Sequence, residues 1–378
     1  MALSKNNKNT NGPLSGLLVI DTSQGIAGPY CGAQLAGYGA RVIKVDPPHG
    51  DWGRGVGERY GTSSVYSVAY NRGKEGIVLD LKKPDDLDTL YKLVAEADVF
   101  LESSRPGVAQ KIGIDFETLK QKNTSLIYLS ISGFGQQGPY STRPCTDGVA
   151  QAFSGLVHGN VGQDGLSHKM DIPIVDIFTG LYAFQSISMA LFERAKTGAA
   201  QYLDNNLVHS ALEVQKAKLI DQHLHGETAA KLNPPSGVYK ANNGDIVIAL
   251  ATEAHYLKLI DAIGAEDLKD VPEYATFLLR SENDGPLRAK IQGIISSKSG
   301  ENWMEILSGA GIIVNTINSV SDVLADDGVT AAGMLRDVEQ AGMGMIRLPT
   351  MPLMDGLEGD APELGQHTDA VLKELAKI

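Results

Sequence analysis

The sequence predicts an α/β protein whose large domain is built on a doubly wound, mostly parallel sheet. Short apolar runs alternate with helical stretches through the first half of the chain, and this alternation is typical of parallel sheets. The 378 residues are enough for two domains, and a composition of 43% hydrophobic and 21% charged residues is that of a globular protein. In such sheets ligands bind beyond the carboxyl ends of the strands.

Five short apolar runs in the first half predict strands. They lie at residues 17–21 (LLVID), 41–46 (RVIKVD), 76–81 (GIVLDL), 98–102 (DVFLE) and 125–131 (SLIYLSI). Residues 29–37 predict a helix rich in small residues. Residues 84–97 predict another, because Pro84 suits a first helical position, acidic residues fill the first turn and the apolar residues have helical spacing.

The second half predicts longer helices and, after residue 232, a pattern that differs from the strand–helix alternation of the first half. A helix runs from Asp176 to about Arg194 and ends in a basic turn followed by Gly198. The run 201–207 (QYLDNNL) and a long helix to about residue 225 follow. After a break at 232–237 (LNPPSG), residues 237–250 predict a hairpin with its turn at NNG, and helices fill 253–307. We expect this stretch to form a second domain.

Composition excludes several classes of function. The formal net charge of −12 argues against general nucleic-acid binding. Two cysteines, Cys31 and Cys145, cannot form a disulfide framework, and no His/Cys cluster has metal-ligand spacing, so we expect no metal site. The polar N-terminus has no apolar core of a signal peptide, and no apolar run reaches the length of a membrane span. A cytoplasmic protein without membrane partners is expected.

The nucleotide fingerprints are missing. The turn after the first strand is TSQGIAGPYCG, with neither GxGxxG nor GxxxxGK[ST], so a nicotinamide dehydrogenase is not indicated. Four basic residues nevertheless lie in loops that flank predicted strands: Arg72, Lys74, Arg105 and Lys111. Taken together, these four side chains can equally well be partners of phosphate groups or ordinary solvated surface charges.

Asp176, in the run DIPIVDIFTGLYAF, has two interpretations. At a helix start its carboxylate would accept backbone N–H bonds and feel the positive end of the helix dipole, so it would stay ionised, as a nucleophile must. The same position is that of an ordinary helix cap, and the local sequence favours the cap. Asp147 can cap the next helix along the chain. His158 and His168, in a Gly-rich loop, are either bases or exposed side chains.

Five blocks in order resemble the class III CoA-transferase family, which includes formyl-CoA, carnitine and bile-acid CoA-transferases and α-methylacyl-CoA racemase. They are GPLSGLLVIDTSQGIAGPYCGAQLAGYGARVIKVDPPHGD, NRGKEGIVLDLKKP, ESSRPGVAQKIGIDFETLKQKNTSLIYLSISGFGQQGPY, VDIFTGLYAFQSISMALFERAKTGAAQYLD and APELGQHTDAVLKEL. The resemblance implies a large Rossmann-like domain made of residues 1–225 and of the segment 331–378, which returns to it as a helix over 361–378. A smaller α/β domain would occupy 226–330, and two chains would interlock as a homodimer.

The resemblance also implies site roles. Asp176 matches the family's nucleophile, which forms an aspartyl anhydride with the acyl group of the CoA donor and then an aspartyl-CoA thioester that an acceptor carboxylic acid resolves. Acyl-CoA is then a substrate, and no permanently bound cofactor is needed. The family's CoA contacts fall on Ile26, Ala27, Asn71, Arg72, Gly73, Lys74, Ser103, Ser104, Arg105, Lys111 and Asp147.

Two departures from the family pattern bear on the reaction. Formyl-CoA transferase has a glycine run where this chain has NPPSGVY, which speaks against a glycine lid and against formate or oxalate as substrate. Racemases have a His where this chain has Thr146, so a two-base proton transfer lacks its partner. We therefore favour a CoA-transferase, with a 2-methylacyl-CoA racemase or related isomerase as the alternative and a non-catalytic acyl-CoA-binding protein as a further one. The sequence identifies neither donor nor acceptor.

Overall fold

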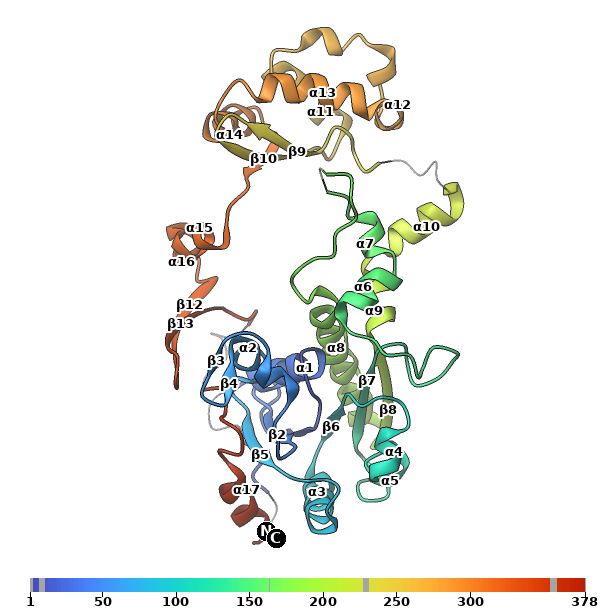
Figure 1. Ribbon diagram of the computed structural model, residues 1–378, viewed down its shortest axis with the longest axis vertical. Helices are drawn as coiled ribbons and strands as arrows, with labels where there is room; N and C mark the ends of the chain where they lie inside the picture. Colours follow the sequence, from blue (N-terminus) through green and yellow to red (C-terminus); the bar gives the residue numbers. More distant parts are fainter. Residues whose placement is uncertain (1–2, 7–10, 163, 227–230, 354–358, 378) are drawn as a thin grey trace. The chain divides into compact units, whose positions relative to one another are not determined.

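The chain forms two compact units in the computed structural model (Figure 1), which describes residues 3–6, 11–162, 164–226, 231–353 and 359–377. The larger unit comprises Met1–Lys216 and Thr330–Ile378, and the smaller comprises Ala217–Val329. The larger unit therefore contains both the N-terminal part of the chain and its C-terminal segment.

A six-stranded sheet organises the larger unit, and every neighbouring pair in it is parallel. Its strands are β1 (Leu18–Asp21), β2 (Arg41–Asp46), β5 (Glu75–Val78), β6 (Val99–Glu102), β7 (Ile127–Ser132) and β8 (Gln201–Asn206). The order across the sheet is β5-β2-β1-β6-β7-β8, so its direction of growth reverses between β1 and β6. The prediction of an α/β fold on a large parallel sheet is confirmed.

Helices cover both faces of this sheet because successive residues of a strand point to opposite faces, and here successive residues are apolar. Val19 belongs to a core shared with α1 (Ala27–Gly37), α8 (Ile174–Thr197) and α9 (Leu207–Val214). Leu18 and Ile20 belong to a second core, shared with α3 (Pro84–Glu96), α4 (Val108–Ile112), α5 (Phe116–Lys120) and α17 (Thr368–Leu375). Pro84 takes the first helical position of α3, as predicted.

Helices α1 and α8 pack together unusually closely, and glycine makes this possible. A Cβ on Gly180 of α8 would lie 2.7 Å from the carbonyl oxygen of Ala27 in α1. Helix α8 is also long and apolar enough to cross a membrane by length and composition alone. Its buried residues, among them Ala183 and Ile187, belong to the core beneath the sheet, which is the packing of a core helix.

Shorter elements complete the larger unit. They are η1 (Trp52–Gly55), β3 (Arg59–Tyr60), β4 (Ser63–Ser64), α2 (Val65–Asn71), α6 (Asp147–Phe153), α7 (Leu156–Gly159), β12 (Leu335–Gln340) and β13 (Gly344–Pro349). The C-terminal segment lies against β5: His367 donates its backbone N–H to the carbonyl of Gly76 at 2.8 Å, and Val78 N–H donates to Thr368 Oγ1 at 3.1 Å.

The smaller unit has its own antiparallel sheet, in the order β11-β10-β9, and its own apolar core. The predicted hairpin is present as β9 (Gly237–Ala241) and β10 (Gly244–Ala249), with β11 (Ile313–Thr316) on the other side of β10. Its helical elements are α10 (Lys216–His225), which begins at the boundary between the units, α11 (Glu253–Ala262), η3 (Glu266–Leu268), η4 (Pro272–Tyr274), α12 (Phe277–Glu282), α13 (Asp284–Ile295), α14 (Gly300–Gly309), α15 (Val320–Ala325) and α16 (Asp327–Ala331).

Three helix predictions are wrong in detail. The C-terminal helix expected over 361–378 spans only Thr368–Leu375. The single helix expected up to residue 225 is divided at Gln215, which leaves helical geometry while its side-chain amide donates to the carbonyl of Ser154 at 2.7 Å. Helix α8 begins at Ile174 rather than at Asp176, so Asp176 is the third helical residue and not the cap.

Replacing Gly180 by alanine should destabilise the larger unit by about 1 to 3 kcal/mol, because the new methyl group collides with backbone of α1 that cannot move aside cheaply. Gly293, inside α13, is the matched control: nothing lies within 4 Å of its added Cβ, and alanine there should stabilise by about 0.5 to 1 kcal/mol. Urea unfolding measures both, and equal effects at the two positions would contradict the close packing of α1 on α8.

Candidate active site

A cavity of about 430 Å³ opens at the carboxyl ends of β1, β6 and β7, where the strand order reverses. This is where parallel α/β sheets bind ligands. It brings together six of the residues singled out from the sequence: Ile26, Ala27, Ser103, Ser104, Arg105 and Asp176. Thr146, Arg143, Cys145 and Trp52 also line it.

Asp147 holds the first turn of α8. Its Oδ2 accepts hydrogen bonds from the backbone N–H groups of Val175 at 2.7 Å and of Asp176 at 3.0 Å, and its Oδ1 accepts from Gln151 Nε2 at 2.5 Å. Val175 and Asp176 are the second and third residues of α8, so these are the N–H groups that a helix cap normally satisfies. Asp147 is itself the first residue of α6 and caps α8, not its own helix.

The carboxylate of Asp176 is therefore not a helix cap. It lines the cavity, is partly exposed, and makes no hydrogen bond or ion pair within the described ranges of the chain. Burial and the neighbouring charge of Asp147 raise the pKa of Asp176 to about 7. The expectation that the helix start keeps Asp176 firmly ionised is wrong, because Asp147 already occupies the N–H groups and adds a like charge.

The groups around Asp176 share its electrostatic environment. Burial and the charge of Asp176 raise the pKa of the Cys145 thiol to about 11, and Arg143 opposes that shift. Burial, Tyr66 and then Asp176 raise the pKa of Tyr70 to about 12. Both groups are therefore neutral at physiological pH, and Asp176 is the group of this set that can exist as an anion there.

The loop after β1 forms one wall of the cavity and is fixed by polar contacts. Ser103 Oγ accepts from Gln24 N–H at 2.9 Å, and Asp51 Oδ1 accepts from Gly25 N–H at 2.8 Å. These bonds place Ile26 and Ala27, where α1 begins, at the cavity.

Residues 71–74 do not line this cavity. Lys74 is 2% exposed, and its ammonium donates to Asp21 Oδ2 at 2.9 Å, to the Pro29 carbonyl at 2.7 Å and to Asn71 Oδ1 at 2.9 Å. All three of its donors are used inside the fold, which corrects the expectation that this side chain faces a phosphate group.

The neighbours of Lys74 are also enclosed. Arg72 is 3% exposed and donates to Gln340 Oε1 of β12 at 2.7 Å, and Gly73 donates its N–H to the Asp360 carbonyl at 3.1 Å. Lys111, at the end of α4, is exposed and lies outside the cavity lining.

Two arginines are the cations of the cavity. Arg105, which follows β6, was identified from the sequence; Arg143, in the loop before α6, was not. The loop that carries Arg143 is held against the end of β7, because Gly133 leaves room for Cys145: a Cβ on Gly133 would lie 2.2 Å from Cys145 Cβ. The only signal for Arg143 in the sequence is a basic residue four positions before Asp147.

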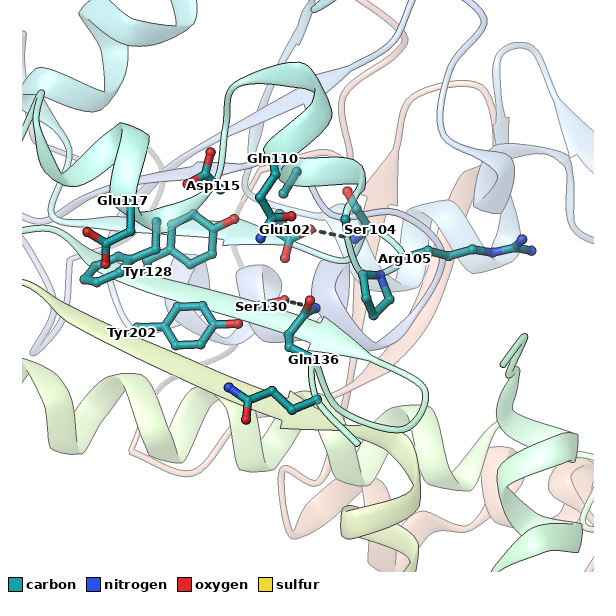
Figure 2. Close-up of a pocket in the computed structure, with 15 residues that line it drawn as sticks. Glu102, Ser104, Arg105, Gln110, Asp115, Glu117, Tyr128, Ser130, Gln136 and Tyr202 are labelled. Carbon is teal, nitrogen blue, oxygen red and sulfur yellow. Dashed lines mark hydrogen bonds between the residues drawn. The ribbon is translucent and has the colours of Figure 1, made fainter. Parts of the chain in front are cut away.

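A second cavity, of about 320 Å³, adjoins the first along Ser104, Arg105 and Pro106 (Figure 2). Its floor carries Tyr128 and Tyr202, whose ring centroids are 5.7 Å apart. Glu102 accepts from Ser104 N–H at 2.7 Å there, and Gln136 Nε2 donates to Ser130 Oγ at 2.8 Å. Burial raises the pKa of Glu102 above its usual value.

The loop histidines lie elsewhere. His168 is exposed, contacts Asp164 at 3.0 Å and does not line the cavity, and neither does His158. In the part of the chain that the structure describes, no group of three or more His, Cys, Asp or Glu side chains is placed to hold a metal ion.

Comparison with known protein families identifies the family of this chain. Residues 14–368 match the family described as CoA-transferase family III. The chain belongs to this family. The enzyme is accordingly a CoA-transferase, and the resemblance seen in the five sequence blocks is confirmed.

Several curated relatives are named CoA-transferases. Succinate–glutarate CoA-transferase of Agrobacterium fabrum is 32% identical, with 98% of this chain and 97% of the relative covered. Acetyl-CoA:oxalate CoA-transferase of Acetobacter aceti is 31% identical, with 97% and 96% covered. Human succinyl-CoA:glutarate CoA-transferase is 30% identical, with 97% and 86% covered.

Solved structures agree on the fold. A CaiB/BaiF family protein from Brucella suis is 31% identical with a TM-score of 0.82, covering 97% of this chain and 100% of that one. The Rv3272 protein from Mycobacterium tuberculosis is 27% identical with a TM-score of 0.85, covering 96% and 100%.

Asp176→Asn should stabilise the protein in a pH-dependent way. The folded pKa of Asp176 lies above its ordinary value, so ionisation disfavours the folded state, and wild-type stability falls as pH rises from about 4 to about 7. Asparagine removes this charge, and after allowance for solvent screening the gain should be about 1 to 3 kcal/mol at pH 8 and near zero at pH 4.

Urea unfolding at the two pH values measures this difference. Asp171→Asn is the control, because Asp171 is fully exposed five residues away and its removal should change stability little at either pH. A gain for Asp176→Asn that is the same at pH 4 and pH 8 would contradict a raised pKa.

Proposed function

We propose that this enzyme moves CoA from an acyl-CoA donor to a small carboxylic acid through covalent intermediates on Asp176. The observation that carries the proposal is the carboxylate of Asp176. It lines the cavity at the strand reversal, it has no partner within the described residues, and its pKa is about 7. A carboxylate of raised basicity that is still substantially ionised at neutral pH is suited to attack a thioester.

The first half-reaction loads CoA onto the enzyme. A carboxylate oxygen of Asp176 attacks the thioester carbonyl carbon, the C–S bond breaks, and CoA leaves as a thiolate from an aspartyl-acyl anhydride. The thiolate then attacks the carbonyl carbon of Asp176, the C–O bond of the anhydride breaks, and the donor's carboxylate departs. The product is an aspartyl-CoA thioester.

The second half-reaction repeats these steps in the opposite order. A carboxylate oxygen of the acceptor attacks the aspartyl thioester and releases CoA thiolate, leaving an anhydride between Asp176 and the acceptor. The thiolate attacks the acceptor's carbonyl carbon, which forms the new acyl-CoA and restores the Asp176 carboxylate. Bonds and charges balance in each step, so the scheme needs no oxidant, reductant or metal.

The surroundings of Asp176 suggest which groups stabilise the tetrahedral oxyanions. The N–H groups at the start of α8 are taken by Asp147, which removes the helix-end donors nearest to the nucleophile. Helix α1 begins at the same cavity with Ala27 and Gly28 and has no side-chain cap. We propose that these N–H groups take the role of oxyanion donors.

CoA is proposed to bind along the cavity past Ile26, Ala27, Ser103, Ser104 and Arg105, with the guanidinium facing phosphate oxygens. We propose that residues 71–74 support the wall behind it, since Arg72 Nη1, the Lys74 ammonium and the Asn71 amide donate to protein groups. Lys111, which is exposed beyond the cavity, remains a proposed contact of the adenosine end.

The racemase alternative is less well supported. Thr146 lines the cavity, but a hydroxyl is not a base at neutral pH, and the curated relatives cited above are named CoA-transferases. Those relatives are named for oxalate, succinate and glutarate, so we propose that a small dicarboxylate is the acceptor. The absence of a glycine lid, expected from NPPSGVY, stays a prediction.

The assembly and location proposed here follow the family resemblance. If the six strands of the sheet are renumbered 1 to 6 along the chain, their order is 3-2-1-4-5-6, as in dinucleotide-binding folds, which supports a Rossmann-like large domain. We propose that this domain consists of residues 1–225 and the returning segment 331–378, with the small domain at 226–330. Met189 and Phe192 of α8 are more than half exposed in the single chain, which is consistent with an interlocked homodimer that covers them. We expect the dimer in the cytoplasm.

Chemical trapping tests the nucleophile. The enzyme is incubated with succinyl-CoA, hydroxylamine is added, and peptides are analysed by mass spectrometry. A hydroxamate on Asp176 is expected, and Asp176→Ala should abolish both label and turnover. Asp171→Ala serves as the control. Full transferase activity in Asp176→Ala, or a label on another residue, would overturn the proposal.

Asp147→Asn should shift the acid limb of the pH profile of kcat/KM. In the wild type this limb is expected near pH 7, where Asp176 loses its proton; removal of the neighbouring charge should move it to lower pH while the amide oxygen still accepts from α8. Asp147→Ala, which also removes the cap, should in addition lose about 0.5 to 2 kcal/mol of stability. An unchanged acid limb in Asp147→Asn would show that Asp147 does not set the pKa.

A further inference from the structure

We propose that Arg143 forms a subsite that binds the free carboxylate of a dicarboxylic acyl group or acceptor beside Asp176. This inference rests on the proposed function and adds to it the residue that selects the substrate. Its basis is the position of Arg143 in the cavity, the aromatic rings around its guanidinium, and the absence, among the described residues, of a hydrogen bond or ion pair to that guanidinium.

Arg143 and Asp176 line the same cavity. Both act electrostatically on the thiol of Cys145, two residues after Arg143. Arg105 also lines this cavity, but it extends to the adjoining cavity as well. Because Arg143 lines only the cavity of Asp176, whereas Arg105 lines both cavities, we assign Arg143 to the acyl end of the ligand.

Three aromatic rings hold the guanidinium of Arg143. Its Cζ lies 5.6 Å from the ring centroid of Phe134, 6.0 Å from that of Tyr140 and 5.5 Å from that of Phe153. The rings contact one another, with Phe134 and Phe153 edge to face at 5.0 Å. Such a platform attracts a cation without using its N–H donors.

The donors of Arg143 remain available to a ligand. Within the described ranges, its guanidinium makes no hydrogen bond or ion pair with the protein. The buried cations are different: Lys74 donates to Asp21 and Arg54 donates to Asp46. Arg143 is exposed at the wall of the cavity, and a planar guanidinium with free N–H donors matches the two oxygens of a carboxylate.

Chemistry favours a substrate carboxylate over a CoA phosphate at this position. The phosphates of CoA are separated from the thioester sulfur by the whole pantetheine arm, whereas Asp176 must contact the thioester carbon. A cation that lines the cavity of Asp176 and does not reach the adjoining cavity is therefore assigned to the acyl group. The acyl groups of succinate and glutarate end in a carboxylate, so this cation would recognise them and not their monocarboxylic analogues.

The experiment compares two donors that differ in the terminal group: succinyl-CoA and butyryl-CoA, which have acyl chains of similar length. The readout is the rate of hydroxamate formation on Asp176 at limiting donor, with kcat and KM measured separately. Arg143→Gln should reduce acylation by succinyl-CoA roughly 10- to 100-fold, mainly through KM, and should change acylation by butyryl-CoA less than about threefold.

Variants separate binding from loss of structure. Arg143→Lys should restore part of the preference for succinyl-CoA, and Phe153→Leu should weaken it less than Arg143→Gln does. Lys122→Gln is the matched control, because Lys122 is an exposed cation 4.8 Å from the ring centroid of Tyr91 and lies outside the cavity lining. Its kinetics should equal those of the wild type.

Other outcomes would overturn the proposal. An equal loss with both donors would assign Arg143 to the oxyanion or to structure, and weaker binding of free CoA would assign it to the phosphates. Equilibrium binding of glutarate to wild type and Arg143→Gln gives a reading that does not depend on Asp176 chemistry. If glutarate binding is lost in Arg143→Gln but no label appears on Asp176 of the wild type, the covalent mechanism is refuted and the subsite is not. If Asp176 is labelled but Arg143→Gln binds glutarate as well as the wild type does, only the subsite is refuted.

Discussion

The contact between the Asp147 carboxylate and the first turn of α8 is the constraint on which the candidate site depends. One carboxylate oxygen accepts from two backbone N–H groups of α8, and the other accepts from the side-chain amide of Gln151. The side-chain oxygen Oε1 of Gln151 in turn accepts from Met170 N–H at 2.9 Å. The start of α6 and the start of α8 are thereby joined. The contact fixes where Asp176 lies, frees its side chain from capping, and places a like charge beside it.

The opposite side of the cavity depends on buried ion pairs. Lys74 pairs with Asp21 at 2.9 Å, and Arg54 with Asp46 at 2.8 Å, while Asp51 fixes the N–H of Gly25. Buried charges without partners are costly, so these side chains have little freedom to turn towards a ligand. Cations that sequence inspection groups together are thus divided into those that support the loops and those that face the cavity.

The sequence predicts local features well and long-range ones poorly. The strands β1, β2, β6 and β7 and the helix that starts at Pro84 follow from periodicity and capping, which are properties of neighbouring residues. The cap of α8 comes from 28 residues upstream, and no local pattern can show it. For the same reason Lys74, a basic residue in a loop, is indistinguishable from Arg105 until burial separates them. Arg143 was missed because its aromatic partners are spread over residues 134–153.

The electrostatics of Asp176 explain why its covalent states are accessible in the proposed reaction. Burial and Asp147 disfavour the ionised carboxylate of the free enzyme, and the shift of its pKa to about 7 corresponds to at most about 4 kcal/mol. In the anhydride and in the thioester that charge is absent, so the unfavourable interaction with Asp147 disappears when Asp176 is acylated. The same interaction must be restored when the product leaves. A pKa near neutrality balances the two demands: a much higher value would leave too little nucleophile, and a lower one would make the acylated states harder to reach.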